Sequence, residues 1–139
     1  MNHAARVMVA VLLLLMAGCA SQTARNLGLD KLAPRKAEQE LSAGIHSYED
    51  GNYKTASRQL QSALDDQLTF TSDKVRAHKY LAFIYCTSER EHQCREEFRK
   101  AFELDPEFKL EPAESGHPMW GPVFKSVKAD MQAQGKITK

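Results

Sequence analysis

The 139-residue sequence lacks an excess of either charge, because 19 Lys and Arg residues stand against 18 Asp and Glu residues. A protein that binds nucleic acid through its phosphates needs a basic surplus, and so does one that adheres to anionic lipid by charge alone. The sequence also lacks an apolar run of about 20 residues, the length that spans a bilayer as a helix. We therefore expect no nucleic-acid partner and no membrane-spanning helix in the mature chain.

Sequence motifs of catalytic sites are also missing. There is no G-x-S-x-G nucleophile motif, no phosphate-binding loop and no H-E-x-x-H zinc motif. His92 and Cys94 are near neighbours that could bind a metal, but no second pair of ligands has metal spacing. We therefore expect a protein that is not an enzyme, with no metal, no cofactor and no small-molecule substrate.

Residues 1–18 have the layout of a secretory signal peptide. One fixed positive charge, Arg6, precedes the apolar run Val7–Met16, and small residues then lead to Cys19. The string LMAGC at 15–19 resembles the bacterial lipobox, whose cysteine becomes the lipidated first residue of the mature chain. Met16 replaces the usual leucine, and an ordinary cleaved signal or an uncleaved anchor remains the alternative.

A lipid on Cys19 is the main consequence of this resemblance. Each buried methylene of an acyl chain such as palmitate contributes about 0.8 kcal/mol, and two or more chains anchor a protein stably. Ala20 follows where lipoproteins kept at the inner membrane carry aspartate, which implies the outer membrane, facing the periplasm. Residues 19–34 are expected to form an acylated N-terminus and flexible tether, or alternatively a short helix near Leu27–Leu32 that docks on the domain.

Residues 75–106 have the periodicity of two paired helices. Apolar and small residues recur at helical spacing on both sides of a short polar turn at Thr87–His92. Pro106 then stops the second helix, because proline has no amide hydrogen to donate. The stretch therefore predicts a helical hairpin.

Residues 35–68 predict another helical hairpin. Gly51 lies in its turn and permits the positive φ angle that such a bend needs. The two hairpins are expected to be joined by a polar loop at Thr71–Lys74, with a helix N-cap at Ser72 or Asp73. The sequence thus indicates an all-α protein.

Both hairpins resemble the tetratricopeptide repeat (TPR), a helix-turn-helix unit of about 34 residues. The first matches the pattern at Gly44, Tyr48, Gly51, Tyr53, Ala56, Leu60 and Ala63, and the second at Ala82, Tyr85, Cys94, Phe98, Ala101 and Pro106. The family tryptophan is replaced by Glu40, and Glu91 stands where a second tyrosine is usual. The resemblance implies two TPR-like hairpins, and so short a solenoid needs a cap at its end.

The C-terminal region predicts that cap. Residues 122–134 carry one apolar helical face, and Gly135 ends the helix. We therefore expect a TPR-like domain over residues 35–135 and a fraying tail over residues 136–139.

Residues 107–121 separate the second hairpin from this cap and have no helical stripe, which predicts a long loop. Trp120 is its most distinctive residue. We expect Trp120 to fill the gap between the second hairpin and the cap helix. The alternative is a loop that binds a partner, so Trp120 is also a candidate partner-binding residue.

Cys86 and Cys94 form an even pair once Cys19 is lipidated. In an oxidising compartment, an antiparallel hairpin could bring them together as a disulfide that links the two helices. The alternative is two buried thiols that serve as small packing residues. Their spacing is not C-x-x-C, so we expect no redox catalysis.

The TPR resemblance implies a concave groove lined by the first helix of each hairpin. The family's groove positions are Glu38, Leu41 and Ile45 in the first hairpin and Arg76, Lys79 and Phe83 in the second. Apolar positions flanked by basic ones would suit an extended or helical peptide with acidic groups. The alternative is that the cap helix or the tether fills this groove.

The order of segments carries a wider resemblance. Lipobox, tether and hairpins are followed by a D-P-x-F-x-L string at Asp105–Leu110 and an H-P-x-W-G-P-V-F string at His117–Phe124. This order is similar to the small TPR lipoproteins associated with bacterial type VI secretion, the TssQ-like family. The resemblance implies an accessory lipoprotein that contacts a protein component of an envelope secretion complex. A pilotin for a secretin or type IV pilus, or a structural lipoprotein that contacts peptidoglycan, remains the alternative.

Overall fold

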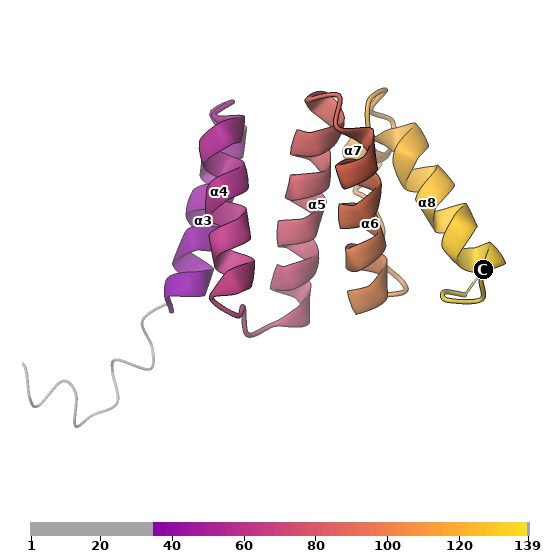
Figure 1. The fold of residues 1–139 in the computed structure, drawn as a ribbon, viewed down its shortest axis with the longest axis horizontal. Coiled ribbons are helices and arrows are strands. Elements are labelled where there is room, and N and C mark those ends of the chain that lie inside the picture. Colours follow the sequence, from indigo (N-terminus) through magenta and orange to yellow (C-terminus); the bar gives the residue numbers. More distant parts are fainter. Residues whose placement is uncertain (1–34, 139) are drawn as a thin grey trace, which may run out of the picture. The chain divides into compact units, whose positions relative to one another are not determined.

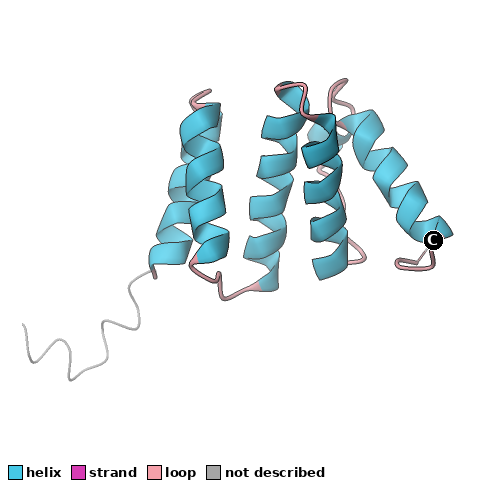
Figure 2. Cartoon of the chain, viewed as in Figure 1, coloured by secondary structure: helices cyan, strands magenta, loops and turns pink. Residues whose placement is uncertain are grey.

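The structure, a computed structural model, describes residues 35–138, which are all-α and contain no strand (Figure 1). The helices are α3 (Lys36–Glu49), α4 (Tyr53–Asp65), α5 (Thr71–Thr87), α6 (Glu91–Leu104), α7 (Pro112–Ser115) and α8 (Gly121–Ala133) (Figure 2). The expected all-α class, with two helical hairpins and a C-terminal helix, is confirmed. The expected signal peptide, lipobox and tether lie outside the described residues.

The first hairpin consists of α3 and α4, which pack against each other along their lengths. Gly44 permits this close approach, since a Cβ atom at this position would lie only 2.8 Å from Cγ of Leu60. Leu60 is fully buried, so the contact belongs to the core of the hairpin. In the turn, Gly51 has a φ angle of 77°, which confirms the left-handed conformation expected there.

The second hairpin consists of α5 and α6, joined by the short turn Ser88–Arg90. A disulfide links Cys86, near the end of α5, to Cys94 in the first half of α6. These are the two cysteines that the sequence analysis paired, and Cys94 is fully buried.

A buried carboxylate also connects α5 with α6. One oxygen of Glu97 lies 2.6 Å from Nδ1 of His78, and the other accepts a hydrogen bond from Nζ of Lys100 at 2.7 Å. Burial raises the pKa of Glu97, but the hydrogen bonds from His78 and Lys100 lower it by more, so the pKa lies below its ordinary value. The carboxylate therefore stays charged inside the protein.

The start of α5 differs from the prediction. The helix begins at Thr71, so the expected loop at Thr71–Lys74 is wrong. Phe70 is the N-cap residue and makes no side-chain capping bond, while its carbonyl accepts hydrogen bonds from the amides of Asp73 and Lys74. Because this first turn is polar and partly exposed, it carries no apolar periodicity that would reveal it as helix.

The core has two parts, and α5 contributes to both. One part lies between the first hairpin and α5, and contains Ala37, Leu41, Ile45, Ala56, Leu60, Ala63, Leu68, Ala77, Leu81 and Ile84. The other lies between α5, α6, α8 and their connections, and includes Val75, Phe83, Phe98, Phe102, Phe108, Trp120, Phe124, Val127, Met131 and Ile137. The helix at the centre of the fold is therefore buried from two sides.

The cap helix α8 packs on α6 and buries Phe124, Val127 and Met131, as its apolar face predicts. The expected fraying of residues 136–139 is wrong where the structure describes them. Ile137 is buried in the core, and the hydroxyl of Thr138 donates a 2.7 Å hydrogen bond to the carboxylate of Glu107. These contacts join segments far apart in the chain, so no local pattern announces them.

Candidate partner-binding surface

The three apolar residues expected to line the groove lie in the core. Leu41 and Ile45 pack among α3, α4 and α5, and Phe83 is only 2% exposed. A partner cannot reach these side chains in this structure, which contradicts their expected role. Glu38 is accessible, but its Oε1 already accepts a 2.7 Å hydrogen bond from the hydroxyl of Thr69.

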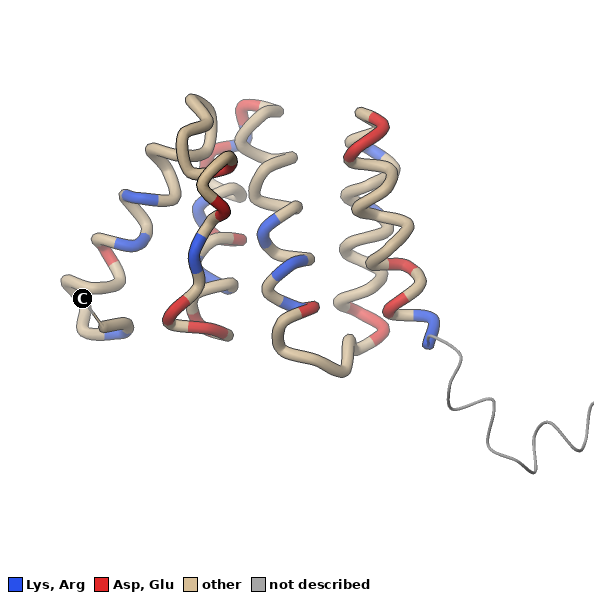
Figure 3. The backbone as a smooth tube through the Cα atoms, turned by 180° about the vertical axis from the view of Figure 1, so that it is seen from behind, with Lys and Arg blue, Asp and Glu red and all other residues tan. Residues whose placement is uncertain are grey.

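The basic groove residues are paired within the chain. Arg76 is exposed, and its Nη1 lies 3.3 Å from Oδ1 of Asp73. Nζ of Lys79 lies 2.6 Å from Oε1 of Glu114, and both of these side chains are largely buried. Figure 3 shows basic segments along the N-terminal half of α5 with acidic segments interspersed nearby. Both cations that the sequence analysis offered to an acidic peptide are therefore paired with carboxylates of the chain itself.

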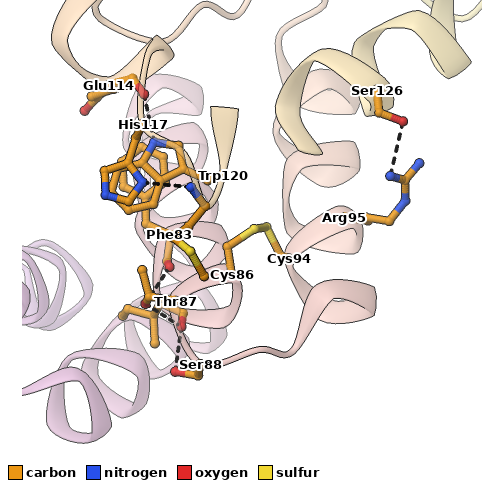
Figure 4. Close-up of a disulfide and its surroundings, with 12 residues drawn as sticks. Phe83, Cys86, Thr87, Ser88, Cys94, Arg95, Glu114, His117, Trp120 and Ser126 are labelled. Carbon is orange, nitrogen blue, oxygen red and sulfur yellow. Dashed lines mark hydrogen bonds between the residues drawn. A yellow bond between two sulfur atoms is a disulfide. The ribbon is translucent and has the colours of Figure 1, made fainter. Parts of the chain in front are cut away.

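Residues 111–120 cover the groove side of the second hairpin. The ring of Trp120 stacks on Phe83 with centroids 4.2 Å apart, and its Nε1 donates a 2.9 Å hydrogen bond to the carbonyl of Glu114 (Figure 4). The ring of His117 stacks in turn on the ring of Trp120. Because Trp120 is 7% exposed, it fills the gap as expected, and the alternative of a partner-binding tryptophan is contradicted.

The covering segment contains the short helix α7, where the sequence predicted only a loop. Glu111 and Glu114 form a capping box at its start, and Pro112 occupies the first turn. The helix is too short to show a periodic pattern. Glu114 of this helix pairs with Lys79 on α5. At this point of the expected groove, the chain itself therefore makes the contact that a partner was expected to make.

Three tyrosines remain accessible beside this cover, and we call Tyr48, Tyr53 and Tyr80 the tyrosine surface. The ring of Tyr48 lies 5.5 Å from that of Tyr53 and 5.0 Å from that of Tyr80, centroid to centroid. Tyr53 is 42% exposed, and the other two are partly buried. Among residues 35–138, none hydrogen bonds to the three hydroxyl groups. The surface therefore joins α3, α4 and α5 in one aromatic patch.

Charged groups of both signs act on this patch. Desolvation raises the pKa of Tyr48 to about 12, and the neighbouring tyrosines and Glu114 add to the effect. Desolvation also raises the pKa of Tyr80, and the carboxylates of Glu114 and Glu49 raise it further. The hydroxyl groups of Tyr48 and Tyr80 therefore stay protonated at neutral pH and are available as hydrogen-bond donors.

The sequence analysis did not identify the tyrosine surface as a site. It matched Tyr48 and Tyr53 to the TPR pattern and did not single out Tyr80. The available signal was the residue type, because a tyrosine has a polar tip that a packing position does not need. Spacing could not show that the three rings meet, since they come from three helices.

Other kinds of site are not found in the described part of the chain. No helix within residues 35–138 is both long and apolar enough to cross a membrane. The same residues contain no group of three or more His, Cys, Asp or Glu side chains that could hold a metal ion. No family model, no curated protein and no solved structure matches this chain.

Proposed function

We propose that the protein is a lipid-anchored adaptor at the periplasmic side of the outer membrane, which binds a protein component of an envelope machine. In this proposal the lipid on Cys19 provides the membrane attachment, and the tyrosine surface of α3, α4 and α5 provides the binding surface. The resemblance to TssQ-like lipoproteins makes an accessory role in type VI secretion the finer proposal. The helical hairpins serve as a rigid support rather than as catalytic machinery.

The tyrosine surface is the observation that supports this proposal. Tyrosine is enriched in protein–protein interfaces because it combines a large apolar ring with a polar tip and loses little conformational entropy. Here Tyr48 and Tyr80 are held by contacts with each other and with Phe83, so the rings are ordered before a partner arrives. Preordered aromatic residues lower the entropic cost of association.

A second candidate is a structural envelope protein that has no groove partner. The cover over the second hairpin favours it, because Trp120 and Glu114 occupy contacts with Phe83 and Lys79 that a partner would otherwise make. The two candidates differ in whether the uncovered tyrosine surface is used. A pilotin differs from the first candidate only in the identity of its partner.

The test is affinity purification of the tagged lipoprotein from crosslinked envelopes, followed by quantitative mass spectrometry. Tyr53→Ser alters the exposed tyrosine at the first position of α4, where serine is well tolerated. Arg58→Ser is the matched control, an exposed change to the same residue on the same helix. We expect at least one envelope protein to be recovered with the wild type and Arg58→Ser, and to be depleted with Tyr53→Ser.

The identity of the depleted protein then decides among the finer proposals. A type VI membrane-complex component supports the accessory role, and a secretin or pilus component moves the protein to the pilotin class. If all three chains recover the same proteins in equal amounts, the tyrosine surface is not used. Recovery of only peptidoglycan and abundant porins would favour the structural candidate.

A further inference from the structure

The tyrosine surface meets a partner with side chains, because the backbone around it is already bonded. Tyr48 and Tyr80 lie within α3 and α5, and the amide of Tyr53 donates a 3.0 Å hydrogen bond to the carbonyl of Gly51. A partner that adds a β-strand needs an edge of unpaired backbone groups. A partner helix needs an apolar groove, and Phe83, which Tyr48 and Tyr80 contact, is buried. Neither of these two modes of peptide binding fits this surface.

Free charges beside the tyrosine surface have both signs. Glu49 and Lys54 are exposed, each directly follows a tyrosine of the surface, and neither has an ion-pair partner among residues 35–138. The cations of Arg76 and Lys79 on α5 are paired with carboxylates of the chain. Neighbouring charges of opposite sign give no preference for a partner of either charge. The surface therefore fits an uncharged partner segment.

The tyrosine hydroxyl groups are unused hydrogen-bond donors. Within residues 35–138, the only buried side-chain oxygen or nitrogen atom without a partner is Oε2 of Glu38. The hydroxyl groups of Tyr48 and Tyr80 have no partner in the same residues, so they reach solvent even though the two side chains are partly buried. A partner with unpaired acceptor groups can use these donors.

The rings of the surface face different directions. The ring of Tyr48 is tilted by 48° to that of Tyr53 and by 68° to that of Tyr80. Nζ of Lys79 lies 4.9 Å from the ring centroid of Tyr80, so one face of this ring is already in use. The exposed ring of Tyr53 therefore offers the main face for an apolar group of a partner.

We propose that the tyrosine surface binds an uncharged, proline-rich segment of a partner protein in the polyproline II conformation. This helix has no internal hydrogen bonds, so its backbone carbonyl groups are free to accept hydrogen bonds from tyrosine hydroxyl groups. Its proline rings pack on aromatic side chains, and its preformed backbone loses little entropy on binding. This inference rests on the proposed function and names the chemistry of the partner at the same surface.

The test is a titration of the whole chain in a neutral detergent, with 13C-labelled tyrosine rings followed by nuclear magnetic resonance. The probe is oligo-L-proline of about six residues, which is about two turns of the helix. Oligo-D-proline of the same length is the control, because it has the same composition and forms the mirror-image helix. The chain has four tyrosines, so each ring signal can be followed separately.

The expected response is confined to the tyrosine surface. Oligo-L-proline should shift the signals of Tyr48, Tyr53 and Tyr80 in a saturable way, and oligo-D-proline should not. Tyr85 is the internal control, since Arg90 already lies against its ring and its signal should stay in place.

Two variants test the part played by the hydroxyl groups. Tyr53→Phe removes one donor and keeps the ring, so it should weaken the binding of oligo-L-proline about threefold or more, the usual effect of losing one hydrogen bond. Tyr85→Phe makes the same change outside the tyrosine surface and should leave the dissociation constant unchanged. In both variants the remaining tyrosine signals report the binding.

The inference is overturned if oligo-D-proline shifts the same signals to the same extent, or if Tyr53→Phe binds oligo-L-proline as tightly as the wild type. It also falls if oligo-L-proline has no effect while Tyr53→Ser still depletes an envelope protein, in which case the proposed function stands with a partner of other chemistry. If oligo-L-proline binds as expected but Tyr53→Ser depletes nothing from envelopes, the proposed function fails and the proline-binding surface remains.

Discussion

Each hairpin consists of two helices packed on each other, but the two hairpins are stabilised by different means. The α3–α4 hairpin depends on close packing at Gly44 and has no covalent link between its helices. The α5–α6 hairpin has the disulfide Cys86–Cys94, the buried carboxylate of Glu97 and a cover that includes Trp120. The reinforced hairpin is thus the one whose groove side is closed.

This difference suggests a division of roles, in which one hairpin contributes most to stability and the other contributes most of the proposed binding surface. Two of the three residues in the tyrosine surface, Tyr48 and Tyr53, belong to the hairpin that has no disulfide between its helices. Where helical units stack side by side, stability is about the sum of the units' own stabilities and of the interfaces between them. The second hairpin can supply much of that sum, which leaves the first free to expose aromatic rings.

Trp120→Ala should have the largest effect, because it removes the cover that distinguishes the second hairpin. We expect the free energy of unfolding to fall by about 3–5 kcal/mol, the usual loss when a buried tryptophan is truncated. Denaturant titration measures this loss. Met119→Ala changes the exposed neighbour and should cost less than about 0.5 kcal/mol. Equal stability of the two variants would show that the indole does not hold the segment in place.

Removing the disulfide should have the next largest effect. The double variant Cys86→Ala with Cys94→Ala should lose about 2–3 kcal/mol, because a short crosslinked loop restricts the unfolded chain. Reduction of the wild type should give a loss of similar size. Intact mass after alkylation under non-reducing conditions provides a separate check, and two alkylated thiols at these positions would contradict the disulfide.

Gly44→Val should weaken the first hairpin by forcing its helices apart. The added side chain would collide with Leu60, and overpacking of this kind costs about 2 kcal/mol. Ser42→Val is the control, because it puts the same β-branched residue at an exposed position of α3. Thermal unfolding compares the two variants. If both unfold at the same temperature, close approach at Gly44 is not what holds this hairpin together.

The pH dependence of stability should show the smallest effect, and part of it should trace to Glu97 in the second hairpin. The folded pKa of Glu97 is below the ordinary value of 4.5, so its contribution is complete above that value and is lost as the pH falls through the folded pKa. The loss should be about 1 kcal/mol, the usual net contribution of a hydrogen bond. Urea titrations from pH 6 to pH 3, about the range over which carboxylates titrate, would measure it.

Glu97→Gln should be less sensitive to acid than the wild type over this range. Glu103→Gln, an exposed change on the same helix, should retain the wild-type profile. A Glu97→Gln profile that overlays the wild type would mean that another carboxylate carries the acid sensitivity.

Local patterns predicted the long helices of the fold but not the short helix α7. Apolar residues at helical spacing predicted both hairpins and the cap helix, and Gly51 predicted the turn in the first hairpin. These signals work because helix formation depends on residues three or four positions apart. The start of α5 was missed for the same reason, since its first turn at Thr71 has no apolar face.

The candidate site could not be predicted in the same way. The TPR resemblance placed Phe83 and Lys79 on the groove side of α5, and it said nothing about which segment lies over that side. The answer depends on contacts such as that between Lys79 and Glu114, which are 35 residues apart in the sequence. Contacts at this separation follow from the three-dimensional fold, and the tyrosine surface is defined by them too.

Because of the disulfide, the stability of the second hairpin depends on the redox state of the compartment that holds the chain. In a reducing cytosol Cys86 and Cys94 would remain thiols, and the hairpin would lack its crosslink. A newly made chain would then be easier to unfold and to thread through a narrow translocation channel. On the export route that the proposed function requires, oxidation after that passage would crosslink the hairpin.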